Sequence, residues 1–292
     1  MMTDAAEPDT RLHAWRPDLA DARLEGKVAA LRFVAGTAKR IAVPLTPLRR
    51  VPRLDASLDT ELIRGETVNV FEETPEGWAW VQNVADRYVG YISSDALGPA
   101  APEPTHRISA LRTFIYPAAD MKLPVRAALS LGSRVAIVGE AETRGTRFGL
   151  LPNAEGAVAM AHLESVDAPP RERDFVAVAL RFLGVPYLWG GRSSLGLDCS
   201  ALVQLSLMTA GVSVLRDTDL QAASIGSPVG TEAGLMRGDL VYWKGHVGIM
   251  VDARTMVHAS GHHMAVVVEP FAEALDRIGR TAGRPHTIRR LA

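Results

Sequence analysis

The sequence predicts a multidomain fold with two small all-β barrels followed by an α+β domain. Three observations support this prediction: a repeat of about 65 residues in the first half, Pro-rich boundaries at residues 98–104 and 168–170, and one cysteine placed between a glycine-rich loop and a helix. A chain of 292 residues with 47% hydrophobic and 22% charged residues is long enough for two or three separate cores.

The chain opens with a segment, residues 1–40, that we expect to be an extended lead-in with one helix at residues 20–33. Its first 15 residues are polar and acidic, with neither a basic stretch nor an apolar run typical of a signal peptide. No window approaches 18 consecutive apolar residues. We therefore expect a cytoplasmic protein that does not bind membranes.

Two similar units follow, at residues 41–98 and 105–167. Corresponding landmarks, such as the runs 65–71 and 132–138, lie 65 to 67 residues apart. Within each unit, alternating apolar residues bounded by Gly, Pro and Asp indicate short antiparallel strands. A unit of about 60 residues built this way closes into a small barrel.

The third domain spans residues 171–292. Apolar spacing predicts a helix at 173–183, ended by Gly184 and Pro186. A second helix is expected at 198–211, with Asp198 as N-cap and Gly211 just past the end. Four apolar runs predict the strands that the helix packs on, at 240–243, 247–251, 256–259 and 266–268.

The chemistry-bearing residues of this domain are Cys199 at the helix start and two histidines on apolar strands, His246 and His258. A thiol at a helix N-terminus with nearby imidazoles supplies a nucleophile, a base and an orienting group. The helix dipole favours the reactive thiolate. The alternatives are an inert buried thiol and histidines that only fill a core.

Two sequence blocks carry a family resemblance. Tyr187-x-Trp189-Gly190-Gly191 followed by Asp198-Cys199-Ser200, and Gly238-Asp239 followed by Gly245-His246-Val247-Gly248, resemble the NlpC/P60 family of cell-wall cysteine peptidases. The resemblance covers residues 171–292, with Ala201 where the family usually has glycine. It implies a papain-like core. The two repeats resemble bacterial SH3 domains, the second in degenerate form.

The resemblance implies a role for each residue of the site. Cys199 would attack an amide carbonyl to give a thioester, and His246 would hold the thiolate as an ion pair and then protonate the leaving amine. His258 would fix the tautomer of His246. Tyr187 would stabilise the oxyanion together with the backbone N–H of Cys199, unless it only packs beside Trp189. Glycines 245 and 248 would leave room around His246.

One subgroup of the family removes L-Ala-γ-D-Glu from murein peptides, and the match extends to it. The residues that would hold the free amino terminus of the substrate are Asp198, Ser200, Asp217, Thr218, Glu66 and Tyr88. An ammonium group requires such anionic and hydroxyl partners. The alternative is that Glu66 and Tyr88 are ordinary barrel residues.

Charge and composition exclude other classes. A formal net charge of −1 without a basic run argues against nucleic-acid binding, and one cysteine excludes an intramolecular disulfide. We expect a monomer that needs no cofactor or metal and whose partner is its murein peptide. Three alternatives remain: an amidase or acyltransferase on the same core, a non-enzymatic wall-binding module, and a zinc site formed by Cys199, His258, His262 and His263.

Overall fold

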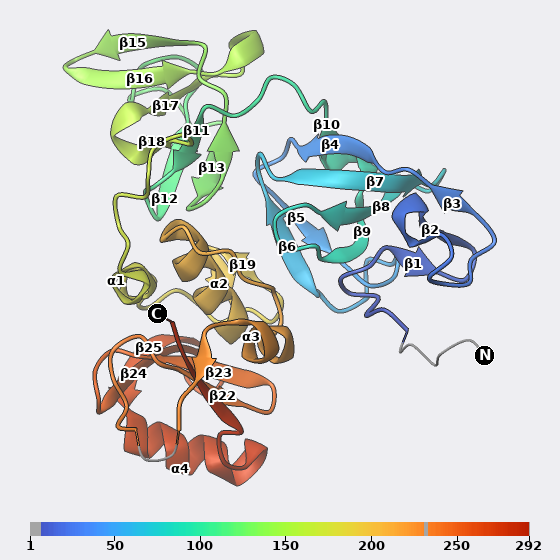
Figure 1. Cartoon of the computed structure of the whole chain (residues 1–292). Helices are drawn as coiled ribbons and strands as arrows, with labels where there is room; N and C mark the ends of the chain where they lie inside the picture. Colours follow the sequence, from blue (N-terminus) through green and yellow to red (C-terminus); the bar gives the residue numbers. More distant parts are fainter. Residues whose placement is uncertain (1–6, 231–232, 292) are drawn as a thin grey trace. The chain divides into compact units, whose positions relative to one another are not determined.

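The computed structural model describes residues 7–230 and 233–291 and forms two compact units (Figure 1). The first ends at Glu103 and the second begins at Pro104. The second repeat therefore belongs to the same unit as the domain that carries Cys199, whereas the first repeat is separate.

The first unit contains a five-stranded antiparallel sheet of order β10-β4-β7-β8-β9 and the hairpin β5–β6. Its core is formed by inward-facing residues such as Ile41, Leu62 and Val81. The strands are β4 (Thr37–Ile41), β5 (Leu45–Leu48), β6 (Thr60–Ile63), β7 (Thr67–Glu73), β8 (Trp78–Asn83), β9 (Val89–Ser93) and β10 (Leu97–Gly98), with a 3-10 turn η2 (Ser94–Ala96).

The predicted helix at residues 20–33 is wrong. This stretch contains the end of β2 (Leu19–Asp21), one 3-10 turn η1 (Ala22–Leu24) and the start of β3 (Phe33–Val34), following β1 (Trp15–Arg16). Gly26 has φ 76°, which ends the turn, and Leu19 packs with Phe71 and Trp80 of the barrel. Residues 1–40 are therefore no extended lead-in: their described part packs on the barrel, whose strand β4 already starts at Thr37.

The second unit starts with eight short strands. Its hairpin β12–β13 begins 67 residues after the corresponding hairpin β5–β6 of the first unit, as the repeat predicts. The elements are β11 (His106–Ile108), β12 (Arg112–Ile115), β13 (Ala127–Ser130), β14 (Arg134–Val135), β15 (Gly139–Thr143), β16 (Thr146–Leu150), β17 (Ala157–Ala159) and β18 (Leu163–Ser165), with 3-10 turns η3 (Pro152–Ala154) and η4 (Met160–His162).

The rest of this unit is a six-stranded sheet of order β21-β26-β22-β23-β24-β25 with helices on both faces. The elements are α1 (Phe175–Leu180), β19 (Arg192–Ser193), β20 (Gly196–Leu197), α2 (Cys199–Thr209), α3 (Thr218–Ser224), β21 (Ser227–Pro228), β22 (Leu240–Trp243), β23 (His246–Met250), β24 (Thr255–Ser260), β25 (Ala265–Pro270), α4 (Phe271–Ala282) and β26 (Thr287–Arg290).

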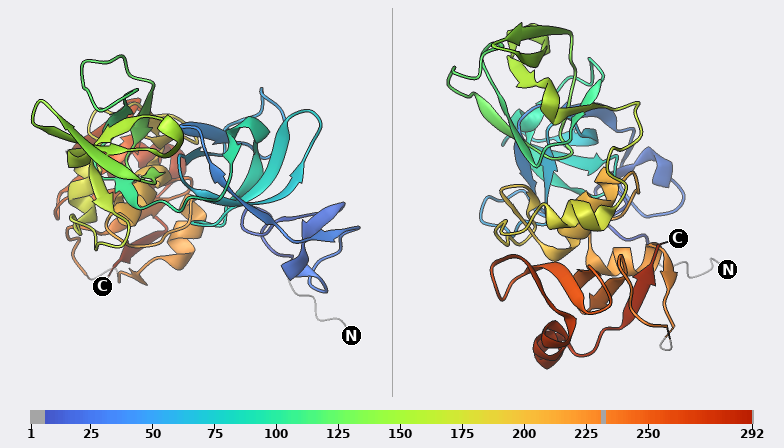
Figure 2. Two further views of the ribbon diagram at one scale, coloured as in Figure 1. Left: turned by 90° about the horizontal axis from the view of Figure 1, so that it is seen from above. Right: turned by 90° about the vertical axis from the view of Figure 1, so that its left-hand side faces the viewer.

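Successive side chains along the strands point to opposite faces of the sheet, and each face forms its own hydrophobic core. Val247 and Val257 pack with α1 and α2, whereas Trp243 and Met256 pack with α4. The right-hand view of Figure 2 shows α4 on the face of the sheet opposite α2. The two predicted helices and four predicted strands are confirmed within a few residues, but α3, α4 and β26 were not predicted.

The second repeat contacts the loop before Cys199. Leu131 is buried in the same core as α2, and the Ser130 hydroxyl accepts a hydrogen bond from Ser194 N at 2.9 Å. Arg112 donates to the Ser194 hydroxyl and carbonyl. These contacts fix the β19–β20 turn, so the second repeat supports the loop that leads into α2. In the described part of the chain, no helix is long and apolar enough to span a membrane.

Candidate active site

Cys199 is the first residue of α2 and is 6% exposed. Asp198 caps the helix, because its side chain accepts a hydrogen bond from Ala201 N at 2.9 Å. The backbone N–H of Val247, the residue after His246, donates to the Cys199 thiol. The start of α2 therefore lies at the start of β23, where the chain also places His246.

The glycine-rich loop brings the chain back to this helix start. Gly190 has φ 71°, and its N–H donates to Oδ2 of Asp198 at 3.0 Å. A Cβ atom on Gly191 would lie 2.7 Å from the Gly196 carbonyl oxygen. Both positions need glycine, since the turn requires a left-handed residue and a close backbone approach.

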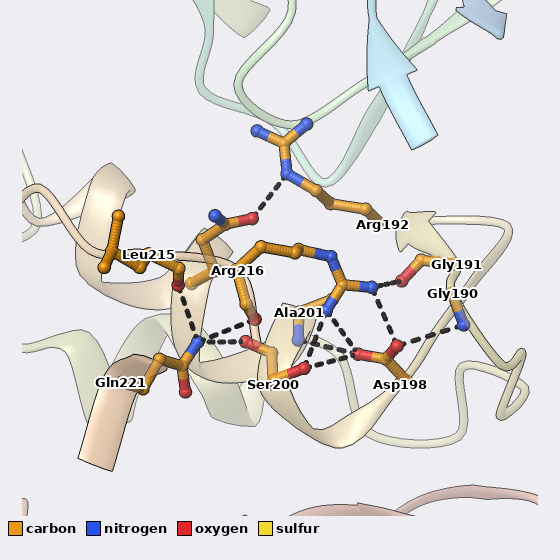
Figure 3. A network of polar contacts seen from close by, with 10 residues as sticks. Gly190, Gly191, Arg192, Asp198, Ser200, Ala201, Leu215, Arg216 and Gln221 are labelled. Atoms are coloured by element: carbon orange, nitrogen blue, oxygen red, sulfur yellow. Dashed lines mark hydrogen bonds and ion pairs between the residues drawn. The ribbon is translucent and has the colours of Figure 1, made fainter. Parts of the chain in front are cut away.

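Asp198 and Ser200 are held by a buried arginine, Arg216 (Figure 3). Its guanidinium bonds both Asp198 oxygens, at 2.9 and 2.7 Å, and the Ser200 hydroxyl at 2.7 Å. Together with Gly190 N, Ala201 N and the Ser200 hydroxyl, Arg216 engages both carboxylate oxygens of Asp198. A carboxylate offers about four lone-pair sites, so the predicted contact of Asp198 with a substrate ammonium would require Arg216 to move.

A chain of four side chains extends from His246. Nε2 of His246 lies 2.7 Å from Nδ1 of His258, and Nε2 of His258 lies 2.6 Å from Oε1 of Glu269. Arg277, on α4, donates to both oxygens of Glu269, at 2.7 Å for Oε2. We call these four residues the histidine relay. His258 thus meets His246 as predicted, while Glu269 and Arg277 are new.

The glycines around His246 act differently from expectation. Gly245 has φ 74° and forms the turn between β22 and β23. A Cβ atom on Gly248 would lie 2.1 Å from the sulfur of Met256. Gly248 therefore makes room for the side chain of Met256 on the neighbouring strand. The prediction that Gly248 leaves space around His246 is wrong.

Burial keeps the thiol and both imidazoles neutral. Burial, and then the charge of Asp198, raises the pKa of Cys199 to about 12, against the opposing hydrogen bond from Val247. Burial lowers the pKa of His246 to about 3 and that of His258 to about 4, the latter against the pull of Glu269. The resting site thus holds a neutral thiol and a neutral base, and the predicted thiolate–imidazolium ion pair is wrong because both groups are buried. The thiol loses its proton as it attacks.

Tyr187 lies close enough to this site to be affected by its charge. Burial, and then the nearby acidic groups Cys199 and Asp198, raises the pKa of the Tyr187 phenol above its ordinary value. Tyr187 N also donates to the Met264 carbonyl at 2.9 Å, which fixes its backbone. The phenol therefore stays protonated and can donate a hydrogen bond.

Asp217 and Thr218 lie at the start of α3, partly buried, directly after Arg216. The Asp217 side chain does not cap this helix. Gln221 instead anchors α3 to the helix start, because its amide donates to the Ser200 carbonyl at 3.0 Å. The sequence stretch after Arg216 is thus held beside Cys199.

Glu66 and Tyr88 belong to the first unit. Oε2 of Glu66 accepts a hydrogen bond from Ile63 N at 2.9 Å, so this buried carboxylate stabilises its own turn. Tyr88 is buried in the barrel core and lines a cavity of about 400 Å³ together with Asp9 and Asp59. These contacts explain both residues as parts of the barrel and leave their predicted substrate role a prediction.

The predicted zinc ligands do not assemble as a group of four. Among residues 7–230 and 233–291, the group with ligand atoms within 4.8 Å of one another is His258, His263 and Glu269, without Cys199. Both Glu269 oxygens already accept hydrogen bonds from Arg277. The geometry therefore fits a hydrogen-bonded relay better than a metal site.

Comparison with known proteins agrees with this geometry. Residues 184–275 match the NlpC/P60 family, and residues 48–97 match the bacterial dipeptidyl-peptidase Sh3 domain. The chain is 29% identical over 227 residues to dipeptidyl-peptidase 6 of Lysinibacillus sphaericus, covering 72% of this chain and 82% of that protein. It is 37% identical over 111 residues to gamma-D-glutamyl-L-lysine dipeptidyl-peptidase of Bacillus subtilis, covering 35% and 36% of the two chains.

The fold is also shared with a solved structure. An NlpC/P60 family protein from Bacillus cereus superimposes with a TM-score of 0.68 at 21% identity, covering 87% of this chain and 99% of that one. The two matched segments coincide with the first repeat and with the domain that carries Cys199. Along the chain, a bacterial SH3 domain of the dipeptidyl-peptidase type is therefore followed by a hydrolase domain of the NlpC/P60 peptidase family.

Proposed function

We propose that the protein is a cysteine peptidase that hydrolyses the γ-D-glutamyl–L-diamino acid bond of murein peptides with a free N-terminal L-Ala. The observation that carries this proposal is the thiol of Cys199 at a helix start beside a strand whose His246 begins a hydrogen-bonded relay. Relatives named dipeptidyl-peptidase 6 and gamma-D-glutamyl-L-lysine dipeptidyl-peptidase support the bond and substrate class.

The reaction follows from the neutral resting state. As the Cys199 sulfur attacks the γ-glutamyl carbonyl, its proton passes to His246, and the backbone N–H of Cys199 with the Tyr187 phenol binds the oxyanion. His246 then protonates the leaving amine of the diamino acid, and a thioester remains on Cys199. Water, deprotonated by His246, releases L-Ala-γ-D-Glu and restores the thiol.

The free amine of the substrate gives the proposal its specificity. Asp217 and Thr218, held beside the helix start through Gln221, supply a carboxylate and a hydroxyl for the ammonium. Glu66 and Tyr88 would add partners from the first barrel. Such peptides have already been released from glycan, so we propose a cytoplasmic enzyme of cell-wall recycling, which cell fractionation with an antibody can test.

Mass spectrometry after incubation with three substrates tests this function. Free L-Ala-γ-D-Glu-diaminopimelate should be cleaved, while its N-acetylated form and intact sacculi should not. Asp217→Asn should lower kcat/KM by more than about tenfold, because a lost charge partner costs ~2–5 kcal/mol. Asp219→Asn, on the exposed side of the same helix, is the matched control.

The first barrel is tested by Glu66→Gln, which removes the charge and keeps an acceptor for Ile63 N. Glu66→Gln should lower kcat/KM for the free peptide without lowering the melting temperature. Equal cleavage of free and acetylated peptides would contradict the amine-binding proposal and indicate a broader cell-wall hydrolase.

A further inference from the structure

The last two members of the histidine relay carry an inference about proton positions. Glu269 is buried, and its carboxylate accepts hydrogen bonds from Arg277 at both oxygens. Burial alone would raise its pKa, but the hydrogen bonds from Arg277 and His258 and the charge of Arg277 lower it below the usual range. Glu269 is therefore ionised, and an ionised carboxylate can only accept hydrogen bonds.

This acceptor determines the tautomer of His258. Its Nε2 lies 2.6 Å from Oε1 of Glu269, so Nε2 must carry the proton. His258 is neutral, because burial lowers its pKa to about 4. A neutral imidazole has one N–H, so Nδ1 of His258 has a lone pair.

The same argument determines the tautomer of His246. Its Nε2 lies 2.7 Å from the bare Nδ1 of His258, so Nε2 of His246 donates the proton. Burial, followed by His258 and Arg277, lowers the pKa of His246, and the charges of Glu269 and Asp198 oppose this shift without reversing it, so His246 is neutral. The one basic nitrogen left on His246 is Nδ1.

We propose that Glu269, clamped by Arg277, is a positioning residue that sets the order of protons along His258 and His246 and leaves Nδ1 of His246 bare as the base for Cys199. This role rests on the proposed function of Cys199 and His246 and adds two residues that touch neither substrate nor thiol. Reversing the order would place a proton on Nδ1 of His246 and remove the base. In serine proteases, a carboxylate with this task is worth up to ~10⁴ in kcat.

The direct test is ¹⁵N NMR of the resting protein labelled at histidine. The expected result is that both His246 and His258 are neutral Nε2–H tautomers. In Glu269→Gln, the amide no longer satisfies both His258 and Arg277, so Nδ1–H forms should appear. An Nδ1–H tautomer of His258 in the unchanged protein would overturn the proposal without any variant.

The kinetic test is the rate of Cys199 alkylation by iodoacetamide, which needs no substrate. Glu269→Gln should slow alkylation and peptide hydrolysis at least about tenfold, with kcat lowered more than KM is raised. In a His258→Asn background, where the amide oxygen can accept from His246 directly, Glu269→Gln should change either rate less than about threefold. Equal effects in both backgrounds would overturn the positioning role.

Glu273→Gln is the matched control, because Glu273 is exposed on α4, one turn before Arg277, and also acts on Arg277 by its charge without being a member of the histidine relay. It should alter neither the tautomers nor the rates. If alkylation depends on Glu269 while no murein peptide is cleaved, the proton order holds and the proposed substrate is wrong. If peptides are cleaved equally by Glu269→Gln, the substrate holds and the proton order is wrong.

Discussion

Two buried carboxylates are associated with the site, and an arginine holds each of them. Asp198 pairs with Arg216 at the start of α2, and Glu269 pairs with Arg277 at the end of the histidine relay. The remaining partners differ. Asp198 accepts from two backbone N–H groups, at Gly190 and Ala201, whereas Glu269 accepts from an imidazole.

The two carboxylate–arginine pairs therefore serve two different purposes. A carboxylate that binds backbone N–H groups fixes the path of the chain, here the loop and the helix that present Cys199. A carboxylate that binds an imidazole fixes the position of a proton. Arg216 is 1% exposed and the side chain of Arg277 is 25% exposed, so the first pair is also the more deeply buried one.

The largest effect is expected where both networks meet, at Cys199. Cys199→Ala should remove peptide hydrolysis while the protein stays folded, and His246→Ala should be about as severe, because residues that act as a unit do not contribute additively. Activity should require a reducing buffer, and His262→Ala should behave as wild type. Turnover of Cys199→Ala within tenfold of wild type, measured by mass spectrometry, would exclude the thioester mechanism.

Removing each arginine should distinguish the two pairs. Arg216→Met leaves the Asp198 carboxylate buried without its partner, and such losses cost ~3–5 kcal/mol. Arg277→Met should cost less than Arg216→Met, because the side chain of Arg277 is 25% exposed and Glu269 keeps His258 as a partner, yet it should reduce kcat. Urea unfolding and steady-state kinetics measure both variants. Similar losses of stability in the two variants would contradict the assigned difference.

The pH dependence of stability should sharpen the same comparison. His246 and His258 are neutral in the folded protein, with pKa values lowered by burial to about 3 and about 4. The unfolded chain therefore binds more protons below pH ~6.5, so the free energy of unfolding should fall as pH drops from there towards 4. Urea unfolding of His258→Asn should show a shallower decline than wild type, and an equal slope would contradict a buried neutral His258.

The sequence predicted the helix start at Asp198 and Cys199, its end at Gly211, and both histidines, because these depend on local capping and short motifs. It missed Arg277 because α4 was not predicted, and it missed Glu269 because this residue on β25 lies one position beyond the strand predicted at 266–268. The signal was present: Phe271, Ala274 and Ile278 have the spacing of one helix face. Arg216 could not be found from sequence, since its pairing with Asp198 depends on how α3 folds back on α2.

The smallest expected effect is that of metal removal. Zinc at His258, His263 and Glu269 would have to displace Arg277 from Glu269 and take the lone pair that orders the relay. EDTA should therefore leave hydrolysis unchanged, and added zinc should only inhibit. His263→Ala should weaken such inhibition without lowering the uninhibited rate, because His263 contacts the Ser260 hydroxyl and is not a member of the relay. Loss of activity on EDTA with recovery on zinc would instead make the His258–Glu269 pair a metal site, and the comparison between the two carboxylates would no longer hold.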